Sequence, residues 1–373
     1  MLERNGHGGD LTTAVELFGV PARDLLDYSA NINPLGPPPG LKDVLHEEWA
    51  GLVHYPDPES RELRRAISQK YNIEPASILI GNGAAEIIDL IVRGFKPGKV
   101  AVVDPAFLEY AEAALKAGAE VLSVPASADD GFAIPEEALF AACEEADLLF
   151  IGQPNNPTGQ WLNKEAVVRL ADTAVTYNTV VVLDEAFIDF FEDERELSFI
   201  REAATSRHVI VIRSMTKFYG IPGLRLGYAS SHPDNISFIR KLQVPWSVNH
   251  LAQKAGVYAL NQSEYETRTR QLVAVERAWL EEELKRIGCL PYPGKANFML
   301  VRTAASGPDA SELQLILGKQ GILIRLCTGF TGLDTRYFRI AVRTCMENER
   351  LIAALRGALC NQQGAEEVDW PSR

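Results

Sequence analysis

The chain has 373 residues, and its 50 aspartate and glutamate residues outnumber its 37 lysine and arginine residues, which gives a formal net charge of −13. Hydrophobic residues make up 46% of the chain, as is typical of folded globular proteins. The negative charge argues against a surface that binds nucleic acid or an anionic membrane, because both partners are polyanions.

The N-terminal residues and the cysteine spacing indicate the cellular location and the state of the thiols. No stretch approaches the roughly 18–20 apolar residues of a membrane span, and the opening residues MLERNGHGGDLTT lack the apolar core of a signal peptide. We therefore expect a cytoplasmic protein. The five cysteines show no CxxC spacing, so we expect reduced thiols, with neither a disulfide framework nor a metal site.

Short apolar runs alternate with helical periodicity through the first two thirds of the chain. The predicted strands are 78–80, 100–103, 148–151, 180–183 and 209–212, and the predicted helices between and after them include 84–93, 109–117, 164–177 and 198–204. Continuous apolar strands separated by helices are typical of a mostly parallel sheet that is covered on both faces. The pattern predicts a large α/β domain.

The pattern changes from about residue 243. A long amphipathic stretch at 251–287 is followed by a strand at 297–302, a helix at 311–320, strands at 322–325 and 337–341, and a helix at 347–359. These elements predict a smaller α+β domain. We divide the chain into an N-terminal arm (1–40), a large domain (41–245), a small C-terminal domain (246–360) and a flexible tail (361–373).

Polar and small residues follow the predicted strands, where parallel sheets gather their ligands. After 78–80, the run GNGAAE at 81–86 leads into a helix and could form a phosphate cradle, although small residues also begin helices for packing reasons. After 148–151, Asn155 and Asn156 lie between prolines in a rigid polar turn, which the backbone conformation alone could also explain.

The next two strands end in charged residues. Asp184 follows 180–183, and a carboxylate there is costly unless it caps a helix or meets a cation. After 209–212 come Ser214, Lys217 and Arg225; an amine that is shielded from water is nucleophilic toward an aldehyde, whereas a single lysine is more often a surface residue. In this order, the four features supply the parts of a pyridoxal phosphate site.

These motifs resemble those of fold-type I pyridoxal-phosphate enzymes of the aspartate aminotransferase superfamily, over nearly the whole chain from residue 7 to about 359. Several stretches are more similar to the threonine-phosphate decarboxylases of cobalamin biosynthesis than to histidinol-phosphate aminotransferases: HGG at 7–9, DYSANINPLG at 27–36, DEAFIDF at 184–190 and PWSVN at 245–249. The resemblance implies a large domain with a mostly parallel central sheet covered by helices, and a smaller α+β C-terminal domain.

The resemblance also implies site residues, with pyridoxal 5'-phosphate as the cofactor. Lys217 and Asp184 would be catalytic: Lys217 would form the Schiff base, and Asp184 would keep the pyridine nitrogen protonated. The other cofactor-binding positions would be Asn156 on the ring hydroxyl, Tyr110 on the ring face, and Gly83, Ala84, Ala85, Ser214 and Arg225 around the phosphate, with Tyr55 reaching the neighbouring subunit's cofactor in a homodimer. The substrate-binding positions would be His7, Gly8, Asn31, Asn156, Arg325 and Arg339.

Three positions qualify this assignment. Many aminotransferases have tyrosine where Phe187 stands, which leaves Asn156 as the main donor to the ring hydroxyl. Family members often have asparagine where Asp10 stands, and we expect this added negative charge to point away from a phosphate. Arg343 lies near Arg339 and is its rival for the role of substrate ligand.

The resemblance implies the decarboxylation of L-threonine O-3-phosphate to (R)-1-aminopropan-2-yl phosphate. A histidinol-phosphate-type or related aminotransferase is the first alternative, because the residues alone do not determine which bond at Cα breaks. A catalytically silent domain of a transcriptional regulator is the second, and the lack of a basic helix-turn-helix segment argues against it. An acidic protein with these ligands must concentrate its cations at one pocket.

Overall fold

The computed structural model describes residues 8–360, so His7 and the predicted tail at 361–373 lie outside the described residues. The chain divides into two compact units. Unit 1 comprises Met1–Pro34, Pro157–Gly159 and Leu272–Arg373, and unit 2 comprises Leu35–Asn156 and Gln160–Gln271. The division differs from the predicted one: residues 246–271 belong to unit 2, and most of the N-terminal arm belongs to unit 1.

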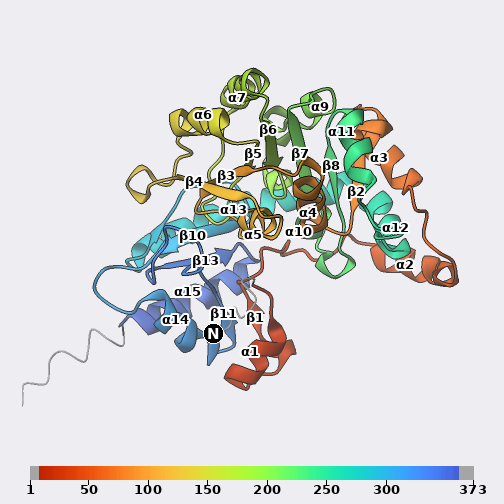
Figure 1. Ribbon diagram of the computed structural model, residues 1–373. Helices are drawn as coiled ribbons and strands as arrows, with labels where there is room; N and C mark the ends of the chain where they lie inside the picture. The colour runs from red at the N-terminus through yellow and green to blue at the C-terminus, as the bar shows by residue number, and fades with distance from the viewer. Residues whose placement is uncertain (1–7, 361–373) are drawn as a thin grey trace, which may run out of the picture. The chain divides into compact units, whose positions relative to one another are not determined.

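Unit 2 is built on a seven-stranded sheet with the order β2-β8-β7-β6-β5-β3-β4. The strand labels in Figure 1 run in the reverse order from left to right. The strands are β2 (Ile78–Gly81), β3 (Lys99–Asp104), β4 (Glu120–Pro125), β5 (Leu148–Gly152), β6 (Val180–Asp184), β7 (Val209–Ser214) and β8 (Gly227–Ser230). The two pairs that contain β8 are antiparallel, and the other four pairs are parallel. The predicted, mostly parallel α/β sheet is confirmed.

Helices surround this sheet. They are α2 (Leu41–Glu47), α3 (Arg61–Tyr71), α4 (Ala84–Phe95), α5 (Glu109–Lys116), α6 (Glu136–Glu145), α7 (Lys164–Tyr177), α8 (Glu194–Leu197), α9 (Ile200–Ala203), α10 (Met215–Phe218), α11 (Pro233–Arg240) and α12 (His250–Ala259). Alternate residues of β3, β5, β6 and β7 pack in one core cluster with apolar residues of α4 and α5. The residues between them are also buried, so both faces of the sheet are covered.

The strand register sets several predicted site residues along one edge of the sheet. Asp184, the last residue of β6, pairs with Gly152 on β5 and with Ile212 on β7. Ser214, the last residue of β7, pairs with Gly227 on β8, which in turn pairs with Gly81 on β2. The carboxyl ends of β2, β5, β6 and β7 therefore meet where α/β proteins bind their ligands.

Unit 1 is an α+β structure with two small sheets, as predicted for the C-terminal part of the chain. Strand β1 (Leu26–Asp27) pairs in parallel with β11 (Ile322–Leu323). The second sheet has the order β12-β13-β10-β9 and contains β9 (Leu290–Pro291), β10 (Phe298–Arg302), β12 (Arg325–Leu326) and β13 (Tyr337–Ala341). Its helices are α1 (Leu11–Phe18), α14 (Ala310–Gly318) and α15 (Cys345–Cys360).

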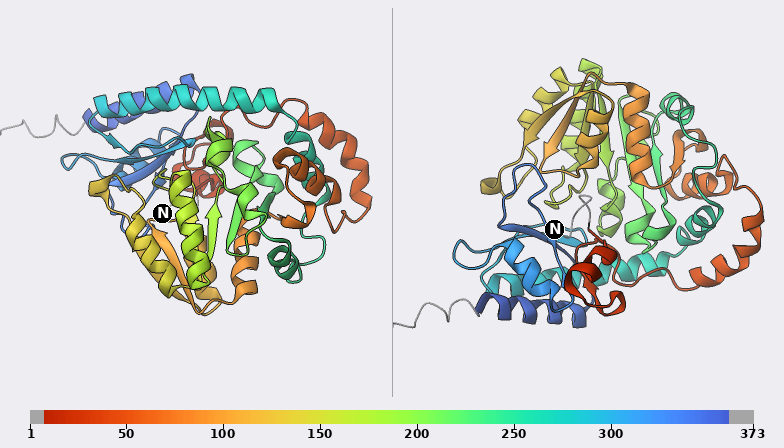
Figure 2. Two further views of the ribbon diagram at one scale, coloured as in Figure 1. Left: turned by 90° about the horizontal axis from the view of Figure 1, so that it is seen from above. Right: turned by 60° about the horizontal axis from the view of Figure 1, so that its bottom comes forward.

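Some predicted elements differ from the observed ones. The stretch 251–287 breaks at residues 260–262 into α12 and α13 (Ser263–Arg286), the long helix drawn in cyan in Figure 2. The predicted strand 322–325 is two strands, because residues 322–323 pair with β1 whereas residues 325–326 pair with β13. Strand β4 was not predicted, since it lies at the sheet edge with a half-exposed, partly polar sequence. No helix among residues 8–360 is long and apolar enough to span a membrane.

Candidate active site

Asp184 lies at the end of β6 with its carboxylate almost fully buried, at 6% exposure. The Tyr110 hydroxyl donates to Oδ2 of Asp184 at 2.7 Å, and the Ala186 backbone N–H donates to Oδ1 at 3.0 Å. Burial raises the pKa of Asp184, while the two hydrogen bonds and the positive charge of Lys217 act in the opposite direction. A cationic partner would therefore stabilise the ionised form of this buried carboxylate.

Tyr110 makes contacts that differ from those expected of a residue that covers a cofactor ring. Its ring stacks on Phe150 with a centroid distance of 4.9 Å and an interplanar angle of 5°, and its side chain is 2% exposed. A ring that stacks on a cofactor keeps one face open in the protein alone. Phe107, three residues earlier, is only half-buried and meets Tyr110 edge-on at 5.6 Å.

Lys217 and Asn156 are half-buried near the same edge of the sheet. Lys217 lies in the four-residue helix α10, directly after β7, and its charge acts on Asp184. The two asparagines after β5 have different environments. Asn155 is buried, and its Nδ2 donates to the Pro105 carbonyl at 2.8 Å, whereas Asn156 keeps part of its surface exposed. Asn155 thus supports the turn that presents Asn156.

Gly83 and Arg225 form one side of a cradle at the start of α4. Gly83 has a φ of +84°, and a Cβ atom there would lie 2.6 Å from Nη2 of Arg225. The guanidinium therefore lies over the first turn of α4, where Ala84 and Ala85 are half-buried. The first N–H groups of a helix have no partners within it, so this turn and the guanidinium together suit a phosphate.

The ends of β7 and β8 complete the cradle. Ser214 Oγ lies 2.8 Å from Oγ1 of Thr216, and both side chains are buried. A Cβ atom on Gly227 would lie 2.9 Å from the Ala84 nitrogen, so glycine permits the close approach of β8 to α4. Sequence reasoning missed Thr216, although its position next to Lys217 and two residues after Ser214 is a usable signal.

In unit 1, two buried arginines lie directly opposite each other on neighbouring antiparallel strands. Arg325 on β12 pairs in register with Arg339 on β13, and they are 3% and 6% exposed. Like charges in such cross-strand positions repel, and two neighbouring guanidiniums suit the binding of an anion. One Arg339 nitrogen, Nη2, donates to the Ser29 carbonyl at 2.6 Å, which fixes its guanidinium.

The N-terminal arm meets this arginine pair in unit 1. A Cβ atom on Gly8 would lie 2.2 Å from the Ser29 carbonyl oxygen, and Gly9 N–H donates to Ser29 Oγ at 2.8 Å. Asn31 is buried, and its Oδ1 has no hydrogen-bond partner among the described residues. Among the predicted substrate positions of unit 1, Gly8 and Arg339 thus share the contact with Ser29. Asn31 lies two residues beyond it.

Arg343 and Asp10 have local partners. Arg343 donates through Nη2 to Glu347 at 2.6 Å, an ion pair within α15 and the turn before it. Arg343, the rival of Arg339 for the role of substrate ligand, is thus engaged in a local ion pair. Asp10 accepts hydrogen bonds from Thr13 through both carboxylate oxygens and caps α1. These contacts are consistent with the expectation that its charge points away from a phosphate.

Tyr55 lies on the surface of unit 2. It is 80% exposed and stacks on Trp246, itself 48% exposed, at a centroid distance of 4.7 Å. Further large apolar side chains on unit 2 are strongly exposed: Trp49, Leu52, Val53 and Val244. Exposed apolar groups in this number are typical of an interaction surface.

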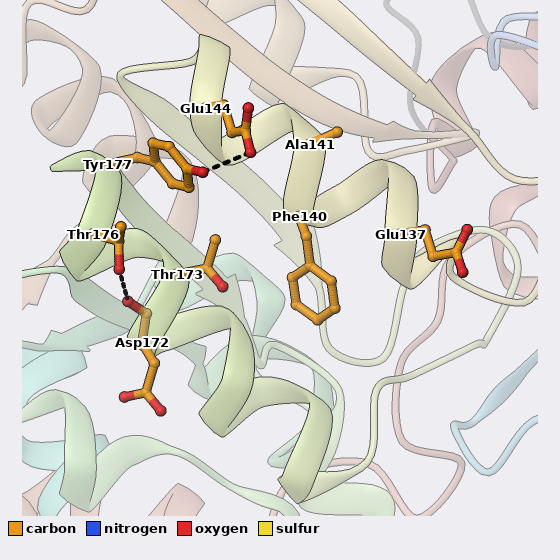
Figure 3. Close-up of a pocket in the computed structure, with 8 residues that line it drawn as sticks. All are labelled: Glu137, Phe140, Ala141, Glu144, Asp172, Thr173, Thr176 and Tyr177. Carbon is orange, nitrogen blue, oxygen red and sulfur yellow. Dashed lines mark hydrogen bonds between the residues drawn. The ribbon is translucent and has the colours of Figure 1, made fainter.

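A separate hollow of about 560 Å³ lies between α6 and α7 (Figure 3). Glu137, Glu144 and Asp172 line it, and Tyr177 donates to Glu144 at 2.7 Å. It contains no cationic side chain and none of the predicted site residues, so its chemistry does not suit a phosphorylated ligand. Within residues 8–360, no group of histidine, cysteine and acidic side chains could hold a metal ion.

The chain is similar to known proteins over most of its length. The family model "Aminotransferase class I and II" matches residues 23–355. A threonine-phosphate decarboxylase from Salmonella typhimurium is 39% identical over 96% of this chain and 98% of its own. A histidinol-phosphate aminotransferase from Ralstonia nicotianae is 33% identical over 96% and 95%.

Solved structures show the same fold. The crystal structure of the histidinol-phosphate aminotransferase from Clostridium acetobutylicum superposes with a TM-score of 0.84 at 32% identity. The match covers 90% of this chain and 100% of that chain.

Proposed function

The chain belongs to the class I and II aminotransferase family, and from that premise we propose that it is a pyridoxal-phosphate-dependent decarboxylase of L-threonine O-3-phosphate. The observation that carries the choice of reaction is the 39% identity to a threonine-phosphate decarboxylase across almost all of both chains. The product would be (R)-1-aminopropan-2-yl phosphate, a building block in cobalamin biosynthesis.

The residues of unit 2 fit the cofactor. Arg225, the start of α4 and the Ser214–Thr216 hydroxyl pair offer a cation and hydrogen-bond donors to its phosphate. The buried Asp184 would bind the protonated pyridine nitrogen, and Asn156 would donate to the ring hydroxyl. Phe107, rather than Tyr110, is the aromatic residue that would cover the ring, because Tyr110 has no exposed face.

When bound, pyridoxal phosphate supplies the aldehyde that condenses with an amine and the protonated ring that accepts the electrons of the broken Cα bond. The protein's own residues bind the cofactor and transfer protons. Lys217 provides the amine that anchors the cofactor, and its Nζ can return a proton to Cα after the carboxylate leaves as CO2. Asp184 holds the proton on the ring nitrogen throughout.

The arginine pair of unit 1 would bind the anionic groups of the substrate. Arg325 and Arg339 present two buried guanidiniums in register, and threonine phosphate offers a carboxylate and a phosphate. Asn31, which is buried two residues beyond Ser29, remains a predicted contact for these anionic groups. His7, which lies outside the described residues, and Gly8 remain predicted substrate contacts.

The enzyme would act as a homodimer in which Tyr55 reaches the cofactor phosphate of the neighbouring subunit. The exposure of Tyr55 at 80%, together with its stacking on the exposed Trp246, supports an interface at this surface. The proposal includes no nucleic-acid or membrane partner. The cytoplasmic location stays a prediction.

One experiment tests the reaction. Purified, cofactor-loaded enzyme is incubated with L-threonine O-3-phosphate, and the CO2 released is measured alongside amino transfer from glutamate to imidazole-acetol phosphate. We expect CO2 release and little transfer. The reverse result would reject the decarboxylase in favour of the histidinol-phosphate aminotransferase, a candidate that the 33% identical relative keeps relevant. Lys217→Ala is the control and should abolish either reaction.

A further inference from the structure

Tyr110 and Asp184 form a buried donor–acceptor pair next to the proposed pyridine site. The phenol oxygen lies 2.7 Å from Oδ2 of the carboxylate. The two residues are 2% and 6% exposed, so water does not compete for this bond. A short hydrogen bond from a neutral donor to an ionised acceptor is among the stronger ones in proteins.

The position of the Tyr110 hydroxyl is set by packing. Its ring lies nearly parallel to Phe150 at 4.9 Å and meets Phe107 edge-on at 5.6 Å, within the core beneath α4 and α5. Burial and the neighbouring Asp184 raise the pKa of Tyr110 far above its ordinary value, so the phenol stays protonated and donates throughout the working range. The donor therefore cannot move away or ionise.

Within residues 8–360, the titratable and charged groups that act on the Asp184 carboxylate are Tyr110 and Lys217, and the Ala186 N–H adds a hydrogen bond to Oδ1. Burial favours the neutral carboxylic acid, whereas these three groups favour the ionised form. If Asp184 took the proton, the pyridine nitrogen would lose it and with it the ring's capacity to accept electrons.

We propose that Tyr110 is a positioning residue that holds Asp184 ionised and aimed at the pyridine nitrogen of the cofactor. This proposal rests on the proposed cofactor site and assigns Tyr110 a role other than ring stacking. The phenol donates to one oxygen and leaves the remaining lone pairs of the carboxylate for the ring N–H. The proton then stays on the ring nitrogen, and no atom is transferred to or from Tyr110.

The test compares Tyr110→Phe with Tyr228→Phe in the cofactor-loaded enzyme. Tyr228 is the matched control, because it is also 2% exposed and its hydroxyl donates to another side chain, Tyr71, at 3.1 Å. Both substitutions remove one buried hydroxyl and keep the ring. Three quantities are measured: thermal stability, the pH titration of the cofactor's visible absorption band, and kcat and KM.

We expect both variants to fold and to bind the cofactor, with similar losses of thermal stability. Only Tyr110→Phe should lower kcat, by roughly 10- to 100-fold, the factor associated with one hydrogen bond to an ionised group. KM should change less than twofold. The acid limb of the pH profile and of the absorption titration should move up by about one pH unit, since Asp184 then takes a proton more easily.

A double variant separates this role from a purely structural one. In an Asp184→Asn background, adding Tyr110→Phe should leave the residual kcat unchanged, because Tyr110 would act only through the carboxylate. Equal effects of Tyr110→Phe in both backgrounds, or the same spectrum for Tyr110→Phe and Tyr228→Phe, would overturn the proposal. The absorption titration needs no substrate, so it tests the role of Tyr110 even if the wild type transaminates instead of releasing CO2.

Discussion

Asp184 shows how one residue can serve the site at a cost to the fold. Its carboxylate is buried at the end of β6, and burial raises its pKa. Between the ordinary aspartate pKa of about 3.9 and the raised value, the folded state binds more protons than the unfolded state. Stability of the protein without cofactor therefore falls as the pH rises through this window and stays lower above it.

Asp184→Asn should consequently stabilise the cofactor-free protein at pH 7, by about 1–3 kcal/mol, while strongly lowering kcat to a residual value. The advantage should vanish below about pH 4, where the wild-type carboxyl is protonated in both states. Thermal unfolding followed by circular dichroism from about pH 3 to 8 measures this. Asp129→Asn, which removes an exposed carboxylate, is the control and should change stability little. A destabilised Asp184→Asn at pH 7 would contradict the argument.

At the scale of elements, the loop from β2 to α4 and the strand β8 are brought close together by glycines. Gly83 adopts a positive φ, and its missing Cβ leaves room for the Arg225 guanidinium. The cradle thus depends on a backbone feature as well as on charged side chains.

Gly83→Ala should weaken pyridoxal phosphate binding by at least about tenfold, because the added methyl displaces Arg225 and strains the backbone. Gly118→Ala is a matched control: Gly118 has a similar φ of +80°, with no atom within 4 Å of the added Cβ. Titration of the apoprotein with cofactor, followed by absorbance, gives both dissociation constants. Equal weakening in the two variants would show that strain, not Arg225, is responsible.

A second element-level feature lies at the same ends of β6 and β7. Arg213, fully buried, donates to Glu185 at 2.8 Å, to Asp189 at 2.8 Å and to Glu194 at 2.7 Å. Glu185 directly follows Asp184 in the chain, and Arg213 directly precedes Ser214. This ion cluster therefore joins the two strand ends that carry the proposed cofactor ligands.

Arg213→Met should destabilise the protein by about 3–5 kcal/mol at pH 7, because three buried carboxylates lose their common cation. Burial already raises the pKa of Glu185 and Asp189, and losing Arg213 raises them further. The loss should shrink as the pH falls and these groups protonate. Urea unfolding at pH 5 and 8 measures it. Arg61→Met breaks only an exposed pair with Asp57 and should cost less than about 1 kcal/mol.

At the scale of the whole molecule, the net charge and the exposed apolar surface predict which partners the protein binds. The net charge of −13 discourages polyanions, yet the proposed ligands are anions that buried arginines and Arg225 would hold. The exposed Tyr55 and its stacking partner Trp246 instead favour a second copy of the chain.

Val53→Asp should convert the proposed dimer to a monomer and weaken cofactor binding, since Tyr55 of the neighbouring subunit would no longer reach the phosphate. Val53 is 81% exposed, so the substitution should not disturb the fold. Val175→Asp changes a valine that is 58% exposed on α7 and should leave assembly intact. Sedimentation velocity measures both. A monomeric wild type with full activity would reject the proposed interface.

The sequence by itself determined the α/β class, the five strands from β2 to β7 other than β4, and the order of polar residues at their ends. These features are local. A strand buried on both faces must be continuously apolar, and ligands bind beyond the carboxyl ends of parallel strands. The same local signals indicated a pyridoxal phosphate site, and the family match agrees with it.

Only the tertiary structure decided which contacts each of several neighbouring residues makes. Packing on Phe150 removes the Tyr110 ring from any cofactor face, Glu347 engages Arg343 but not Arg339 in an ion pair, and strand pairing divides residues 322–326 between two sheets. Each of these contacts is made with a residue 4 to about 300 positions away along the chain. Residues that lie within one helical turn of each other can fit the same sequence pattern equally well, so the pattern alone does not distinguish them. Strand register and side-chain burial determine which of these residues makes each contact.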